Sequence, residues 1–189
     1  MQEVQKAYTT FFGVEKPDYE IFSPYRVCPL GAHSDHQHGI VTGIAFDKGI
    51  NLLLSKTEDG SVEMISFEFD GLVGFNVLDS SIKKQEHWGD YLRGCVLSLR
   101  RHYPLKKGLK GVVKGSIPIG GLASSAALIC GFIIGLAKAN NIELTKLQII
   151  NYASYVEREF VGLKNGLLDH ACAVLSEANK LLFFDTDTQ

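Results

Sequence analysis

The sequence predicts one α+β domain in which strands fill the first part of the chain and helices the second. Short apolar runs bounded by glycine lie between residues 19 and 77, which is typical of strands. Longer apolar stretches with helical spacing follow residue 120. Because strands and helices do not alternate regularly, we expect a mixed sheet covered by packed helices rather than repeated βαβ units. With 189 residues, of which 46% are hydrophobic, the chain can form one sizeable core.

The strand-rich part begins with a predicted helix. Val4, Ala7, Tyr8 and Phe11 have helical spacing, and Gly13 is a stop signal. Glycine-bounded apolar runs then predict strands at residues 19–27, 49–55, 61–69 and 72–77.

The second part begins with a predicted helix at residues 89–103 and a strand at 108–114. A long helix is expected from the serines near residue 124 to about residue 140. A second helix is expected at 145–160, with Thr145 as its N-cap. A turn at 162–166, a helical piece at 167–175 and a strand at 180–185 complete the prediction.

Composition excludes several classes of protein. The net charge of −2 and the short basic run at 106–110 give no surface for nucleic acid. The chain has four widely separated cysteines, which are Cys28, Cys95, Cys130 and Cys172. Their spacing fits reduced thiols, so we expect a cytoplasmic protein. The N-terminus has no signal-peptide pattern, and the longest apolar stretch is too short to cross a membrane. We therefore expect neither a nucleic-acid nor a membrane partner.

A glycine turn precedes the long helix. Gly120 and Gly121 allow close approach of the backbone, and Ala123, Ser124 and Ser125 open a helix whose free amides favour an anion. The serine hydroxyls can bind phosphate oxygens or magnesium. The segment is not a Walker A loop, since no Gly-Lys-Ser/Thr follows. Alternatively, the glycines only turn the chain and the serines only cap the helix.

Two acidic residues are candidates for phosphoryl chemistry. Glu157 lies near the end of a predicted helix, and Asp169 follows a glycine-bounded turn in an apolar setting. One carboxylate could orient a hydroxyl for attack on a phosphoryl group while the other holds magnesium. Alternatively, both are ordinary surface acids, and the charged neighbours Arg158 and Glu159 favour that interpretation for Glu157.

Residues 26–39 form a polar loop that leaves a predicted strand. Its Asp35 and three histidines could in principle bind a transition metal, but the spacing places no two histidines on one helical face. Arg26, at the strand end, suits a phosphate or carboxylate. The single tryptophan, Trp88, is either a core or rim residue or a platform for a planar base.

These loops together resemble the GHMP small-molecule kinases. Pro118-Ile-Gly-Gly-Leu-Ala-Ser-Ser-Ala resembles their phosphate-binding motif. Arg26-Val-Cys-Pro-Leu-Gly-Ala-His-Ser-Asp-His resembles the sugar-binding signature of galactokinases. Gly166-Leu-Leu-Asp-His is similar to the segment that carries their catalytic aspartate. The three motifs occur in family order, and the resemblance extends from about Tyr19 to Asp185, nearly the whole chain.

The resemblance implies transfer of the γ-phosphate of ATP to the anomeric hydroxyl of a sugar. It implies Asp169 as base or orienting anion, Arg26 as its partner, and Ser125 and Glu157 as magnesium ligands. It further implies that His33 and Asp35 form hydrogen bonds with sugar hydroxyls. The nucleotide would be held by the following residues: Gly120, Gly121, Leu122, Ala123, Ser124, Ser125 and, near the adenine, Trp88.

Two positions depart from the galactokinase pattern. Ala32 stands where galactokinases carry a glutamate, and His36 where they carry a tyrosine. That glutamate binds the hydroxyl on the sixth carbon of the sugar and would repel a carboxylate there, whereas alanine removes the repulsion. The loop is therefore more similar to that of galacturonokinases and favours a sugar acid, although another neutral sugar stays open.

Family members carry a further C-terminal domain with another glycine-rich motif. We expect residues 1–189 to be the N-terminal, ATP- and sugar-binding domain alone, with the C-terminal GHMP domain absent, and to bind nucleotide weakly with little or no turnover. The alternative is a non-catalytic galactokinase-like regulator that binds sugar or nucleotide. The oligomeric state is not predicted.

Overall fold

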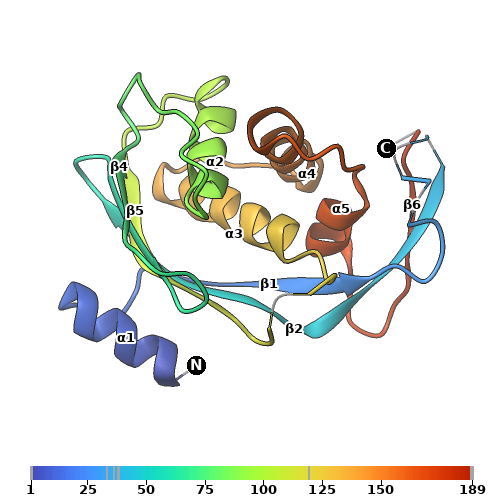
Figure 1. The fold of residues 1–189 in the computed structure, drawn as a ribbon, viewed down its shortest axis with the longest axis horizontal. Helices are drawn as coiled ribbons and strands as arrows, with labels where there is room; N and C mark the ends of the chain where they lie inside the picture. The colour runs from blue at the N-terminus through green and yellow to red at the C-terminus, as the bar shows by residue number, and fades with distance from the viewer. Residues whose placement is uncertain (1, 33, 36, 38, 119, 188–189) are drawn as a thin grey trace.

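The computed structural model describes residues 2–32, 34, 35, 37, 39–118 and 120–187. These residues form a six-stranded mixed sheet with helices on both faces, as Figure 1 shows. The strands follow the order β1–β2–β5–β3–β4, and β6 pairs with β2. The β3–β5 pair is parallel, and the other pairs are antiparallel. The strands are β1 Tyr19–Val27, β2 Ile40–Thr57, β3 Ser61–Ser66, β4 Val73–Asn76, β5 Gly108–Gly115 and β6 Leu182–Asp185. The predicted α+β architecture is confirmed.

Helices α2 to α5 lie along one face of the sheet, whereas α1 lies under the other face (Figure 1). Their bounds are α1 Gln2–Phe12, α2 Asp90–Arg100, α3 Ser124–Ala139, α4 Lys146–Tyr155 and α5 Leu168–Leu175. A π-helical turn, η1, continues α4 over Val156–Val161. Thr145 caps α4 as predicted, because its hydroxyl accepts from the Gln148 amide and the Gln148 side chain accepts from the Thr145 amide.

The strands of the core alternate their side chains between the two helical layers. Leu52 and Leu54 of β2 join the main core with Ile129 and Ile133 of α3. Leu53, between them, points to the opposite face and packs with α1. The chain thus has a large core on the helical side and a small one under α1.

Strand β2 has 18 residues, more than twice the length of the strand predicted at 49–55, so this part of the prediction was wrong. Gly43 and Gly49 lie inside the strand rather than at its ends. A Cβ at Gly43 would lie 2.0 Å from the Cys172 sulfur, and one at Gly49 would lie 2.2 Å from the Ser23 carbonyl oxygen. Gly43 therefore permits close packing of α5 on the sheet, and Gly49 permits the close approach of β1, uses that the sequence does not distinguish from a turn.

Within the described part of the chain, no helix is both long and apolar enough to cross a membrane.

Candidate active site

The site begins with an ion pair between the end of β1 and the first turn of α5. Arg26 and Asp169 are 143 residues apart in sequence. The Asp169 Oδ1 atom lies 2.7 Å from Arg26 Nε and 2.6 Å from Arg26 Nη2. Both side chains are largely buried, at 18% and 16% exposed. Two nitrogens of the planar guanidinium thus hold one carboxylate oxygen and fix the carboxylate in place.

Arg26 also ties the glycine turn to this ion pair. Its amide donates to the Leu122 carbonyl at 3.2 Å, and its Nη1 donates to the Gly121 carbonyl at 3.3 Å. Gly121 has a φ of 60°, and a Cβ there would meet open space, as it would at Gly120. The guanidinium therefore lies between the carboxylate of Asp169 and the backbone of the turn.

Helix α3 begins directly after this turn. Ala123, its N-cap residue, adopts the left-handed conformation at φ 58°, and its side chain caps no amide. The first amides of a helix need acceptors, and here the side chain of the N-cap supplies none. An anion such as a phosphate suits this end of α3.

The second carboxylate of the site is buried and well partnered. Ser125 Oγ donates to Glu157 Oε1 at 2.6 Å, and Asn165 Nδ2 donates to Oε2 at 3.2 Å. Glu157 is 0% exposed, so the interpretation of this residue as a surface acid is wrong. The π-helical turn η1 carries its side chain inward despite the charged neighbours in sequence.

His170 lies against the same carboxylate. Its Nε2 is 3.3 Å from Glu157 Oε2, and the histidine is also 0% exposed. Burial lowers the pKa of His170 to about 4, although the nearby Asp169 charge acts in the opposite direction. The imidazole is therefore neutral at physiological pH.

The oxygen donors at this point fit a magnesium ion. Mg²⁺ in phosphoryl-transfer sites takes one or two protein oxygens and completes its shell with phosphate and water. The Ser125 hydroxyl and the Glu157 carboxylate are hard oxygen ligands that lie next to the open end of α3. The donor set therefore suits magnesium better than a softer transition metal.

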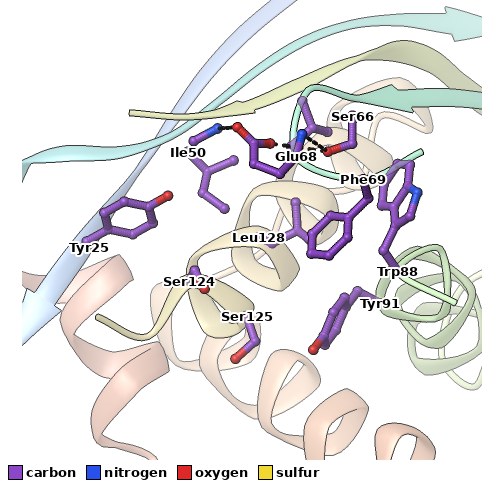
Figure 2. A pocket seen from close by; sticks show the side chains of 12 residues that line it. Tyr25, Ile50, Ser66, Glu68, Phe69, Trp88, Tyr91, Ser124, Ser125 and Leu128 are labelled. Atoms are coloured by element: carbon purple, nitrogen blue, oxygen red, sulfur yellow. Dashed lines mark hydrogen bonds between the residues drawn. The ribbon is translucent and has the colours of Figure 1, made fainter. Parts of the chain in front are cut away.

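An aromatic pocket adjoins the start of α3. Figure 2 shows the rings of Phe69, Trp88 and Tyr91 together at one end and Tyr25 at the other, with Ser124 and Ser125 along the side formed by α3. Phe69 and Trp88 are stacked, with ring centroids 6.5 Å apart and planes inclined by 18°. Trp88 is only 7% exposed, so it is both a core residue and a wall of the pocket. A planar base would find apolar faces here.

A polar bridge closes one wall of this pocket. Glu68 accepts a hydrogen bond from the Gly115 amide at 2.8 Å and one from the Ser66 hydroxyl at 3.2 Å, both visible in Figure 2. The bridge joins the end of β3 to the end of β5.

Sequence reasoning found only Trp88, Ser124 and Ser125 among the pocket residues. The others lie far apart in sequence and carry no motif: Tyr25, Ile50, Ser66, Glu68, Phe69, Tyr91, Val113, Gly115 and Leu128. The alternation of β1 and the helical face of α2 could have indicated Tyr25 and Tyr91 as buried, but not as neighbours.

The polar loop between β1 and β2 lies beside the Arg26–Asp169 pair. Leu30 anchors it through a 3.0 Å hydrogen bond from its amide to the Thr42 hydroxyl, and Ala32 is exposed. Asp35 packs against Gly166, because a Cβ there would lie 2.3 Å from the Asp35 carboxylate. The predicted sugar ligands His33 and His36, and also His38, lie outside the described residues.

Among the described residues, no three His, Cys, Asp or Glu side chains cluster as ligands for a metal ion. Because the three loop histidines are not described, this finding does not test the metal alternative for that loop.

Comparison with known proteins relates this geometry to a family. Residues 90–177 match the family described as the GHMP kinases N terminal domain. The chain is 32% identical over 208 residues to a galacturonokinase of Arabidopsis thaliana, with 100% of this chain and 49% of the relative covered. It is 31% identical over 194 residues to a galactokinase of Staphylococcus saprophyticus, with 100% and 50% covered. The chain thus spans about half the length of these curated relatives.

A solved structure agrees with these relatives. The galactokinase of Lactococcus lactis, crystallised in complex with galactose, superposes with a TM-score of 0.93 at 27% identity. The match covers 99% of this chain and 49% of that protein. Together with the motif order and the shared fold, these matches show that the chain belongs to the GHMP kinases and resembles the N-terminal part of galactokinases and galacturonokinases.

Proposed function

We propose that this chain is the nucleotide- and sugar-binding part of an ATP-dependent kinase that phosphorylates a monosaccharide at its anomeric hydroxyl. The products would be the sugar 1-phosphate and ADP. The observation that carries the proposal is the Arg26–Asp169 pair, held at 2.6 Å against the glycine turn and beside Ser125 and Glu157. Phosphoryl transfer depends mainly on positioning and charge stabilisation, and this arrangement supplies both.

The adenine and the phosphates of the nucleotide would lie on opposite sides of Ser124. The aromatic pocket suits an adenine, and the uncapped amides of α3 suit the phosphates. Ser125 and Glu157 would hold magnesium, which supplies positive charge to the phosphate oxygens when it is bound. The turn residues Gly120, Gly121, Leu122 and Ala123 bring the backbone close to those phosphates.

The position of Asp169 supports a role at the attacking hydroxyl. Its Oδ1 is engaged by two nitrogens of Arg26, so a fixed carboxylate faces the site. We assign Asp169 as the group that accepts or orients the hydroxyl proton. Arg26, bonded also to Gly121, lies where its charge stabilises the phosphoryl group during transfer.

The loop between β1 and β2 supports a sugar acid as the substrate. We assign His33 and Asp35 to sugar hydroxyls, and we assign Ala32 and His36 to the sixth carbon. Galacturonate carries a carboxylate there, which a small neutral side chain accepts and a histidine can attract. The similarity to a galacturonokinase supports the same choice.

The proposal covers the whole protein. Because the relatives are about twice as long, we propose that full activity needs a second domain and that residues 1–189 alone bind nucleotide weakly and turn over slowly. The four free cysteines fit a reducing compartment, and we propose the cytoplasm.

The substrate is tested by comparing specificity constants for galactose and galacturonate in the full-length protein, with ATP and magnesium. We expect galacturonate to be preferred by about tenfold or more, because a histidine near the sixth carbon attracts a carboxylate but gains no charge interaction with the neutral hydroxyl of galactose. A tenfold preference for galactose would contradict the sugar-acid assignment, and no turnover with any sugar would favour the regulator.

A further inference from the structure

The two oxygens of Glu157 have different partners. Oε1 faces the Ser125 hydroxyl at 2.6 Å, on the side of the α3 terminus. Oε2 receives Asn165 Nδ2 at 3.2 Å and lies 3.3 Å from His170 Nε2. One oxygen therefore faces the site, while the other faces the protein interior.

Packing alone does not account for a histidine at position 170. Its side chain is 0% exposed, and neither ring nitrogen makes a well-aligned hydrogen bond within the described structure. A buried polar ring without partners costs free energy that a leucine of similar size would avoid. The acceptor within reach of Nε2 is Glu157 Oε2, which a slight rotation of the ring would align for a hydrogen bond.

Position 170 also follows Asp169 directly in α5. In this helical turn, Asp169 contacts Arg26 and His170 contacts Glu157. Glu157 lies in a π-helical turn that ends at Gly162, which has a φ of 93°. A regular helix therefore does not fix the direction of the Glu157 side chain. Donors from outside η1 are then needed to fix the carboxylate.

We propose that His170 is a positioning residue that, together with Asn165, holds Oε2 of Glu157 so that Oε1 and the Ser125 hydroxyl face the magnesium of the bound nucleotide. His170 touches neither substrate nor metal and acts through Glu157. The inference rests on the proposed function, because it requires a metal–nucleotide complex at this site. Groups that hold a ligating carboxylate typically change metal affinity about 10- to 100-fold when removed.

The test measures how strongly a metal ion improves nucleotide binding. Calorimetry gives the affinity of the full-length protein for the non-hydrolysable analogue AMPPNP, once with Mn²⁺ and once with EDTA. In the wild type, Mn²⁺ should increase the affinity. In His170→Leu, we expect this metal-dependent gain to fall by about tenfold while the affinity in EDTA stays the same. His170→Gln, which keeps a donor, should recover most of the gain.

Two further variants separate positioning from general loss of stability. Val174→Ala shortens a partly buried side chain of the same helix that packs against both neighbouring core clusters, and it should lower the melting temperature without changing the metal-dependent gain. Asn165→Leu removes the second donor and should reduce the gain, which provides the answer even if His170→Leu does not fold.

The outcomes separate the positioning role of His170 from the proposed kinase function. If His170→Leu or, where that variant does not fold, Asn165→Leu keeps the full metal-dependent gain, the positioning role is refuted while the kinase proposal stands. The same holds if Val174→Ala loses as much of the gain. If the full-length wild type itself does not bind AMPPNP with Mn²⁺, the proposed function fails, and the inference fails with it.

Discussion

The nucleotide side and the sugar side of the site are built differently. On the nucleotide side, β-strands and helices supply a pocket of aromatic rings and a fully buried carboxylate. On the proposed sugar side, a loop between β1 and β2 presents the exposed Ala32 and the half-buried Asp35. Rigid elements fix a site more firmly than loops do. Under the proposed function, this chain largely completes the nucleotide site but supplies only one wall of the sugar site.

The two sides meet at Asp169, and its removal should have the largest effect. Asp169→Asn keeps the size of the side chain but cannot take a proton, so we expect kcat of the full-length protein to fall by about a thousandfold. Nucleotide affinity, measured by calorimetry, should change little. Glu159→Gln, which removes an exposed carboxylate, is the control and should keep wild-type turnover. A variant at 169 with near-normal kcat would remove the catalytic assignment.

A change at Gly166 should affect the sugar side alone. A Cβ there would lie 2.3 Å from the Asp35 carboxylate, so Gly166→Val must displace Asp35. We expect KM for the sugar to rise by about 10- to 100-fold, because misplaced positioning groups have effects of this size. Affinity for AMPPNP should stay the same. Gly74→Ala is the matched control, since its Cβ would have only one neighbour, at 4.0 Å. An unchanged sugar KM would show that Asp35 does not contact the substrate.

A change at Phe69 should affect the nucleotide side alone, and more weakly. Phe69 is 44% exposed and stacks on Trp88 in the pocket, so Phe69→Ala removes an apolar wall without opening the main core. Aromatic contacts contribute about 0.5–1.5 kcal/mol beyond their buried area, which predicts a loss of nucleotide affinity of several-fold. Phe67→Ala is the control, because Phe67 is similarly exposed, at 38%, but does not line the pocket. Equal losses in both variants would place the base elsewhere.

The sequence predicts features that depend on neighbouring residues better than features that depend on residues far apart in the chain. The Thr145 cap, the start of α3 and the bounds of β1 depend on neighbouring residues, and the sequence predicts them closely. The resemblance between motifs brought Arg26 and Asp169 together, although they are 143 residues apart. Most walls of the aromatic pocket carry no motif, so only the folded chain reveals them.

Two errors have a common physical origin. Gly49 was interpreted as the boundary of a strand, but tertiary contacts require the absence of a side chain there and at Gly43. The charged neighbours of Glu157 favoured the alternative of a surface acid over the magnesium ligand that the resemblance implied, but a π-helical turn changes the direction of its side chain and buries it. A helical period of 3.6 residues cannot indicate such a turn, because the extra residue shifts the face of everything that follows.

The pairing of β2 with β6 has a consequence for the order of events during synthesis. Ile40 pairs with Asp185, and Arg26 meets Asp169, so both contacts join the beginning of the domain to its end. Contacts of such large sequence separation slow folding and form late. A ribosome that has made only the first two-thirds of this domain has produced most of the sheet but not α5, which carries Asp169 and His170. We therefore expect the emerging chain to gain ligand affinity abruptly, near the end of translation of the domain, rather than gradually as its strands appear.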